Sequence, residues 1–596
     1  MRVQGVNAPG ARQRRGTGPP HPQRQRRGHA RVAAGREPGG GDGGGGAASS
    51  SSSVADLPLP EGEMGLPFVG ETLALLRDGD SFGIERTRRY GPLWKTHILG
   101  APTVMVYAEP DVRAVLAGDG AAFESWWPPA TAALVGAASL NLLAQPRQGQ
   151  VKAAFTRAFG EPAVAAYLPA VVRAAVATLD AWAAATRGGG GGGGEGAGPD
   201  GAAADAAAAE AAAAALGGLP AARAALPLCD LLASATFHAA LLGPSPADPA
   251  GAAPGEGAGA AALVAAAAAR ARLASALAGG FVPPALELPF TPFGAARAAR
   301  RELLALYASA LADARARRGG AAEAQAGRAP AAIDALAAAP PAAAGDEELL
   351  DGIVACLFGN AGAGPTMLKL LQYIQPPDHI FRPGAEAGAG SGGGGGCRWW
   401  AALREEQRAV IAAHGPAIGA AALEGMPVAE AVAREALRIS PVVPAIFRRA
   451  VVDFELRGRR IPKGWLVYCH TGGGVLRYNQ DSFDPARWLG DGGGGGDAAA
   501  EEGGGGSGCP LAPLWQGEGV GGTPFGAGSR ACVGRPLMMA QLKALAALLV
   551  RRYAWRSAAG AAEPWVVVPA PRPAAGLGGF ELRRLPEGEA LPVAGV

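Results

Sequence analysis

One cysteine of the six, Cys532, stands in surroundings that indicate chemistry. It follows a loop at residues 525–531 in which Gly526 and Gly528 allow backbone conformations that a Cβ would forbid, so that the backbone can approach a large ligand closely. Leucines at helical spacing from Leu537 onward predict a helix that begins just past the cysteine. The amides of its first turn favour the thiolate, which is the form of cysteine that binds metals.

The loop reads Phe-Gly-x-Gly-x-Arg-x-Cys-x-Gly and resembles the haem-binding loop of the cytochrome P450 family of haem-thiolate monooxygenases. The resemblance implies haem b (iron protoporphyrin IX) as cofactor, Cys532 as the axial thiolate ligand and Arg530 as partner of a haem propionate. The alternatives are a small buried cysteine and a zinc site; the second is disfavoured because the cysteines form no Cys-x-x-Cys pair. The implied cofactor-binding residues of the loop are Phe525, Gly526, Gly528, Arg530, Cys532 and Gly534.

A second motif lies about a hundred residues earlier. Glu435 and Arg438 are three residues apart, so in a helix they share a face and can pair. Such a pair alone is common on solvated helices, but here it precedes a proline-rich turn and a Phe-Asp-Pro-Ala-Arg-Trp run that contains Arg487. The resemblance implies that these three residues form a buried structural charge network.

Residues 346–374 predict a long core helix with acidic residues at its start. The glycines and Pro365 in its middle oppose a helix, and the alternative is a loop after which a second helix begins at Pro365. The resemblance to the cytochrome P450 family implies that this helix crosses the haem face. Gly362 and Ala363 stand where the family usually has an acid and a threonine that deliver protons, and neither side chain transfers a proton. Thr366, one turn further on, is the candidate catalytic substitute.

Two further positions are implied to contact propionates. Arg448 matches one of them, and Lys152, four residues after Gln148, stands where the family usually has an arginine. A solvated lysine on a helix surface is the alternative for Lys152. We also expect Arg530, Arg535 and Lys543 to cluster on the face that docks an acidic redox partner.

The fold class implied by the resemblance is mainly α, a helical bundle with a small β region and with haem between the long central helix and the cysteine loop. Two β-rich runs around Gly100 predict a hairpin, and residues 461–464 predict a turn between two strands. We assign 57–590 to one domain, because glycine- and alanine-rich tracts too poor in apolar side chains to form a core read as surface insertions. These lie near 187–218, 243–259, 318–345, 384–396 and 490–508.

Residues 1–56 form a basic leader, since positions 1–40 hold nine Arg and one acid while the whole chain has a net charge of only +3. The leader is compatible with a transit peptide to a plastid or other organelle, or with a disordered tail. Because no aromatic residues are interleaved with the arginines, we expect no nucleic acid as partner. We expect a monomer with at most peripheral membrane association, and a peripheral or cytoplasmic location is the alternative to an organelle.

Residues 65–73 and 89–106 resemble the eukaryotic branch that oxidises abscisic acid, brassinosteroids and other sterols, and retinoic acid. The implied function is hydroxylation of an apolar small molecule, such as a sterol, a terpenoid or a carotenoid-derived compound, with electrons from a reductase or ferredoxin. Sterol metabolism is one implied setting. Gly362 and Ala363 keep two alternatives open: a haem-thiolate hydroperoxide isomerase or lyase, and a catalytically impaired haem-binding protein, including one that results from misassigned exon boundaries.

Overall fold

The computed structural model describes residues 31–32, 53–67, 69–78, 80–187, 210, 225–243, 257–279, 286–319, 330–377, 380, 396–471, 483–489, 523–557, 565–566, 572–573 and 580–594. Most of the predicted leader lies outside the described residues. So do most residues of the predicted insertions near 187–218, 243–259, 384–396 and 490–508, and residues 320–329 of the one near 318–345.

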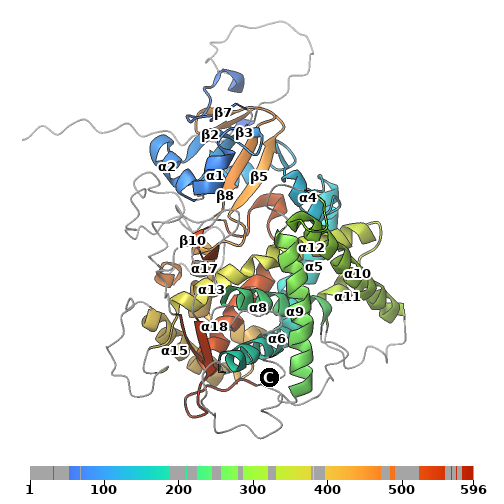
Figure 1. Ribbon diagram of the computed structural model, residues 1–596, viewed down its shortest axis with the longest axis vertical. Helices are drawn as coiled ribbons and strands as arrows, with labels where there is room; N and C mark the ends of the chain where they lie inside the picture. The colour runs from blue at the N-terminus through green and yellow to red at the C-terminus, as the bar shows by residue number, and fades with distance from the viewer. Residues whose placement is uncertain are drawn as a thin grey trace, which may run out of the picture.

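The strands of the principal sheet lie at one end of the molecule with two short helices, and most of the remaining helices form a bundle beside them (Figure 1). The principal sheet has the order β2-β3-β8-β5-β4. The predicted hairpin is confirmed, because β2 and β3 pair antiparallel around Leu99 and Gly100, which both have positive φ. β3 then pairs in parallel with β8, and β5 joins β8 to β4. The strands of this sheet are β2 Leu93–Ile98, β3 Ala101–Val106, β4 Phe123–Ser125, β5 Ala445–Ala450 and β8 Leu466–His470.

Smaller pairings complete the β structure. The predicted turn at residues 461–464 lies between β7 and β8, while β6 and β7 form a hairpin around Arg457 and Gly458. The short strands are β1 Arg31–Val32, β6 Phe454–Leu456, β7 Arg459–Ile461, β9 Tyr553–Ser557, β10 Trp565–Val566, β11 Arg572–Pro573 and β12 Phe580–Arg584.

The largest hydrophobic core lies within the helical bundle and includes residues of α5, α6, α8, α12, α13, α17 and α18. The helices are α1 Thr72–Asp78, α2 Asp80–Tyr90, α3 Glu109–Ala117, α4 Pro129–Val135, α5 Arg147–Phe159, α6 Glu161–Arg187, α8 Ala225–Leu242, α9 Gly257–Gly279, α10 Pro292–Gly319, α11 Ala332–Ala337, α12 Asp346–Ala361, α13 Ala363–Tyr373, α15 Gly396–His414, α16 Ala420–Glu424, α17 Pro427–Ile439 and α18 Arg535–Arg552. Short 3₁₀ turns span Val54–Asp56, Pro485–Trp488 and Gly528–Arg530.

Three helical stretches are long and apolar enough to cross a membrane: Glu161–Thr186, Ala225–Leu242 and Asp346–Tyr373. Between 61% and 72% of their most apolar windows is buried inside the fold. Packing in the core therefore accounts for their apolar composition.

The prediction of a surface insertion near 318–345 is wrong for its second half. Residues 332–337 form α11, and Ile333 and Leu336 on it are fully buried in the helical core. Alanine has a high helix propensity, so one isoleucine and one leucine suffice to anchor a short alanine-rich helix.

The predicted central helix is present but interrupted. α12 ends at Ala361 and α13 begins at Ala363, with Gly362 between them. Pro365 therefore falls in the first turn of α13, where an N–H would have no partner within the helix, so the proline does not break it. The interruption lies at the glycine and not at Pro365, where the alternative prediction placed it.

The three predicted network residues come together where α17 meets the 3₁₀ turn at residues 485–488. The Glu435 side chain is fully buried, and Arg438 binds it through two hydrogen bonds of 2.8 and 2.9 Å. Arg487 Nε lies 3.0 Å from Glu435 Oε2. The indole N–H of Trp488 and the backbone N–H of Asp484 also donate to this carboxylate.

Burial alone would raise the pKa of Glu435, but the hydrogen bonds of Arg438 and of the Asp484 backbone, together with the charges of Arg438 and Arg487, outweigh it and lower the pKa. The carboxylate is thus ionised and fully satisfied at neutral pH, and it joins α17 to the segment that follows β8.

Removing the charge of Glu435 should cost far more stability than removing the charge of a surface pair with the same spacing. We expect Glu435→Gln to lower the free energy of unfolding by about 3 kcal/mol or more, because the buried Arg438 and the partly buried Arg487 lose their counter-charge. Glu405→Gln, in the exposed pair between Glu405 and Arg408, should cost less than about 1 kcal/mol. Urea unfolding followed by tryptophan fluorescence measures both; equal losses would contradict a buried network.

Asp230 of α8 lies against the first turn of α13. Its Oδ1 would be only 1.9 Å from a Cβ placed on Gly364, so the glycine makes room for the carboxyl group. Burial raises the pKa of Asp230 to about 7. An unfolded aspartate has a pKa near 3.8. Above that value the unfolded chain loses a proton that the folded chain retains, so this group increasingly destabilises the fold from about pH 4 to pH 7.

We therefore expect Asp230→Asn to stabilise the protein at pH 8, by at most about 4 kcal/mol, and to have no effect near pH 4. The thermal midpoint of variant and wild type, compared at both pH values, measures this. Asp313→Asn, at an exposed position of α10, is the matched control and should show no such pH dependence. A gain for Asp230→Asn that is the same at both pH values would contradict the assignment.

Candidate functional site

The glycine loop at residues 525–531 precedes α18. Its start is tied to the end of β8 by the Thr523 N–H, which donates to the Thr471 carbonyl. The Cys532 N–H returns to the Phe525 carbonyl at 2.9 Å and closes the loop. The Phe525 side chain packs against the helical core.

The two predicted glycine conformations are confirmed. Gly526 and Gly528 have φ values of +67° and +69°, in the left-handed region. A Cβ on Gly528 would also lie 2.6 Å from the Leu116 carbonyl oxygen. The backbone of the loop therefore rests directly on the last turn of α3, and a larger residue at this position would push it away.

Cys532 stands at the start of α18, as predicted. The backbone N–H groups of Gly534 and Arg535 donate to its sulfur and lower its pKa, and the charge of Lys152 acts in the same direction. Burial is the larger effect, and the pKa of the thiol is raised on balance. The amides at the helix start thus act in the expected direction, toward the thiolate, but burial outweighs them.

The Cys532 side chain is exposed although burial dominates its pKa. A thiol can be accessible to solvent and still be surrounded by protein atoms if it faces an open space within the fold. On α12, a Cβ added to Gly359 would meet no atom within 4 Å. The charge of Cys532 also influences the pKa of Cys356, one turn before Gly359. The charge effect places the loop near the middle of α12, where Gly359 leaves open space.

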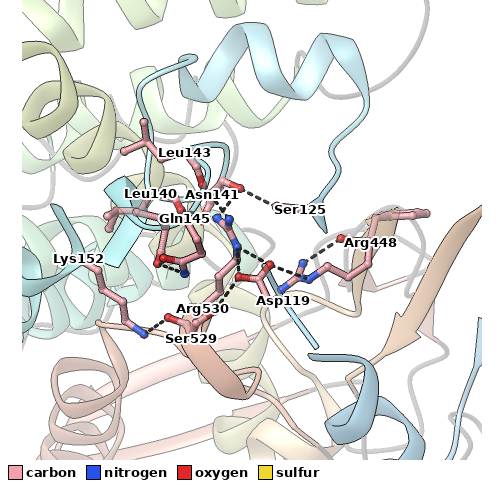
Figure 2. A network of polar contacts seen from close by, with 12 residues as sticks. Asp119, Ser125, Leu140, Asn141, Leu143, Gln145, Lys152, Arg448, Ser529 and Arg530 are labelled. Carbon is pink, nitrogen blue, oxygen red and sulfur yellow. Dashed lines mark hydrogen bonds and ion pairs between the residues drawn. The ribbon is translucent and has the colours of Figure 1, made fainter. Parts of the chain in front are cut away.

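A cluster of buried charges adjoins the loop (Figure 2). Arg530 Nε lies 2.9 and 3.0 Å from the two carboxylate oxygens of Asp119. Arg448 Nε lies 3.7 Å from the same carboxylate. The Lys152 ammonium donates to the Ser529 carbonyl at 2.6 Å. Arg448, Arg530 and Lys152, which the sequence implied at the haem site, are thus brought together around the loop.

The cluster holds an excess of positive charge. Asp119 faces two arginines, and Lys152 adds a third cation. Burial lowers the pKa of Lys152, while the charge of Cys532 opposes this and that of Arg530 adds to it. The Arg448 side chain is only 3% exposed, and its Nε has no hydrogen-bond partner among the described residues. An anionic ligand would balance this charge.

Three sequence expectations are corrected by these contacts. Arg530 directs its N–H groups to Asp119 and to the carbonyls of residues 140, 141 and 143, so the protein itself occupies much of the hydrogen-bonding capacity expected for a propionate. The hydroxyl of Thr366 is fully buried and donates to the Ser440 carbonyl at 2.7 Å, which gives its catalytic role no support. Lys543 is buried and paired with Glu430, so of the expected docking cluster only Arg535 is exposed.

Asp119 is a residue of the cluster that the sequence analysis did not select. It is a single acid after a helix, and its main partner, Arg530, is 411 positions away in the chain. The signal that could have found it is indirect: two inward arginines next to a metal-binding cysteine require a nearby carboxylate.

Comparison with known proteins supports the same assignment. The family model described as Cytochrome P450 matches residues 399–565, which include Glu435, Arg438 and Cys532. Human cytochrome P450 26C1 is 28% identical over 542 residues, covering 87% of this chain and 88% of the relative. Cytochrome P450 26A1 of Danio rerio is 34% identical over 125 residues, or 21% of this chain. The structure described as retinoic acid bound cyanobacterial CYP120A1 covers 89% of this chain at 21% identity with a TM-score of 0.61, which shows the shared fold.

The described residues fit haem b. Cys532 offers an exposed sulfur ligand, Gly359 of α12 leaves open space beside it for a flat group, and Arg448 and Lys152 provide charge for two propionates. Motif, fold, charge and relatives agree that the chain is similar to the cytochrome P450 family of haem-containing monooxygenases.

Proposed function

We propose that this monooxygenase hydroxylates an apolar, isoprenoid-derived small molecule of the carotenoid-derived class, to which retinoic acid belongs. Support comes from the wall of the space beside the loop and from the relatives. The cyanobacterial structure with the same fold holds retinoic acid. The comparisons give no support to sterol metabolism, and we do not propose a sterol substrate.

The side chains that adjoin the space are apolar. Ile446 of β5 lies 3.3 Å from a Cβ placed on Gly526, and Val442 lies 2.7 Å from one placed on Gly362. Trp127 packs edge-on against Phe358 of α12. All these side chains are partly exposed although they lie within the fold. Contact with such surfaces favours a substrate that has few polar groups.

The overall reaction consumes dioxygen, two electrons and two protons, and yields one hydroxyl group on the substrate and one water. When bound, the haem supplies the dioxygen-activating chemistry, and a reductase or ferredoxin supplies the electrons. Cys532 would hold the iron as thiolate, and the N–H groups of Gly534 and Arg535 would stabilise that charge. Arg448 and Lys152 would hold the propionates.

Cys532→Ala should abolish the thiolate-type Soret band in the reduced carbon monoxide difference spectrum and abolish hydroxylation. The physical reason is that Cys532 follows the glycine loop directly and is the one exposed cysteine among the four whose side chains the structure describes. Cys229→Ala, at a buried position of α8, is the control and should keep the band. A wild-type spectrum without this band would overturn the assignment of the ligand.

The substrate class is tested by incubating the reconstituted enzyme with retinoic acid and, separately, with a sterol. Binding should shift the ferric Soret band, and mass spectrometry should detect the product with one added oxygen atom. Turnover of the sterol but not of retinoic acid would contradict the proposal.

A second function, rearrangement of a lipid hydroperoxide, is favoured by one observation. At the interruption of the central helix Gly362 and Ala363 carry no proton-transferring group, and the Asn360 amide donates to the Ala233 carbonyl. Isomerisation of a hydroperoxide needs neither external electrons nor protons. Rapid turnover of a lipid hydroperoxide without reductase, together with no reductase-dependent product, would favour this second function.

Thr366→Val tests the predicted proton relay directly. Because the hydroxyl is committed to the Ser440 carbonyl, we expect a loss of about 1 kcal/mol in the free energy of unfolding. The ratio of hydroxylated product to consumed NAD(P)H should stay within about twofold of wild type, since a tenfold change corresponds to about 1.4 kcal/mol in a barrier and no reacting group is removed. A large rise in peroxide release would instead show that Thr366 delivers protons.

A further inference from the structure

Asp119 occupies a constrained position directly after α3. Its backbone forms an isolated bridge with Phe123, and the next residue, Gly120, has a φ of +83°. The carboxylate is 1% exposed. An isolated carboxylate at this depth would be costly, so its partners must account for its presence.

Two consecutive residues of the ligand loop bind this carboxylate. Ser529 Oγ donates to Oδ2 at 2.6 Å, and Arg530 Nε lies within 3.0 Å of both oxygens. Burial would raise the pKa of Asp119, but the hydrogen bonds of Ser529 and Arg530 and the charges of Arg530 and Arg448 outweigh it and lower the pKa. Asp119 is therefore an anion held between the loop and β5.

The contacts on the other sides of the loop show what this anion does. Arg530 NH1 and NH2 donate to the carbonyls of residues 140, 141 and 143, and Lys152 donates to the Ser529 carbonyl (Figure 2). The segment of Ser529 and Arg530 is thus fixed from three places in the chain, three residues or fewer before Cys532. Asp119 is the only one of these partners that carries negative charge among the described residues of the cluster.

The two arginines interact differently with this carboxylate. The Nε of Arg530 donates to Asp119, and its other N–H groups donate to backbone carbonyls. Arg448 approaches Asp119 only to 3.7 Å, and its Nε makes no hydrogen bond within the described part of the chain. The Nε–H of Arg448 therefore remains able to bind a further anion, whereas the N–H groups of Arg530 hold the loop in place.

We propose that Asp119 is a positioning residue of the haem site, which holds the Ser529 and Arg530 segment in place for Cys532 and leaves Arg448 to the haem carboxylates. This rests on haem as the cofactor and not on the identity of the substrate. Preorganisation of this kind lowers the cost of ordering the loop when haem binds. Loss of Asp119 thus weakens haem retention without removing any group that touches the iron.

The experiment measures the rate at which haem passes from the holoprotein to an excess of apomyoglobin. Asp119→Asn should lose haem at least about tenfold faster than wild type, and neutralising a buried negative charge beside the site should make the midpoint potential of the haem more positive. Glu124→Gln is the matched control: Glu124 and Arg449 form an exposed pair between β4 and β5, next to Arg448. This control should match wild type in both measurements.

A double-mutant cycle separates positioning from general loss of stability. Ser529→Ala alone should speed haem loss several-fold, and Asp119→Asn with Ser529→Ala should be no faster than Asp119→Asn alone, because both act through one contact. Additive effects, or a haem-loss rate for Asp119→Asn within twofold of wild type, would overturn the proposal. If Asp119→Asn fails to fold, Ser529→Ala decides, and a wild-type rate for it overturns the proposal. Neither measurement needs a substrate, so its outcome is independent of the proposed hydroxylation.

Discussion

The structure depends on how buried positive charge is balanced around one short loop. Arg448 and Arg530 share the carboxylate of Asp119, and Lys152 approaches from α5. The protein's own groups leave part of this charge unbalanced, and the cofactor of the family carries the complementary carboxylates. The fold and the cofactor are therefore not independent: the site is stable as a charged interior only when both contribute.

A second buried carboxylate uses the same principle without a cofactor. Glu435 is satisfied by Arg438, Arg487, an indole N–H and a backbone N–H, all from the protein. It fixes α17, while the cysteine precedes α18, and both helices belong to one hydrophobic core. Rigid support for the ligand loop thus comes from a closed network, whereas the network beside the ligand itself stays open on one side.

Local signals made much of this predictable. The turn at Gly100, the loop glycines, the helix after Cys532 and the spacing of Glu435 and Arg438 all depend on residues close together in sequence. Contacts between distant segments were not predictable, which is why Asp119 was missed and why Lys543 was placed on a surface although it reaches Glu430. The position of the helix interruption also escaped prediction, because the first turn of α13 tolerates Pro365 and the break falls on Gly362.

The parallel pairing of β3 with β8 has a consequence for synthesis on the ribosome. The hairpin of β2 and β3 is complete by residue 106, but the strand that covers its open edge begins at residue 466. During translation the edge of β3 has no partner strand while the helices between residues 107 and 465 are synthesised. An unpaired strand edge is a site for misassociation. The nascent chain thus completes its sheet late, only shortly before the cysteine loop emerges.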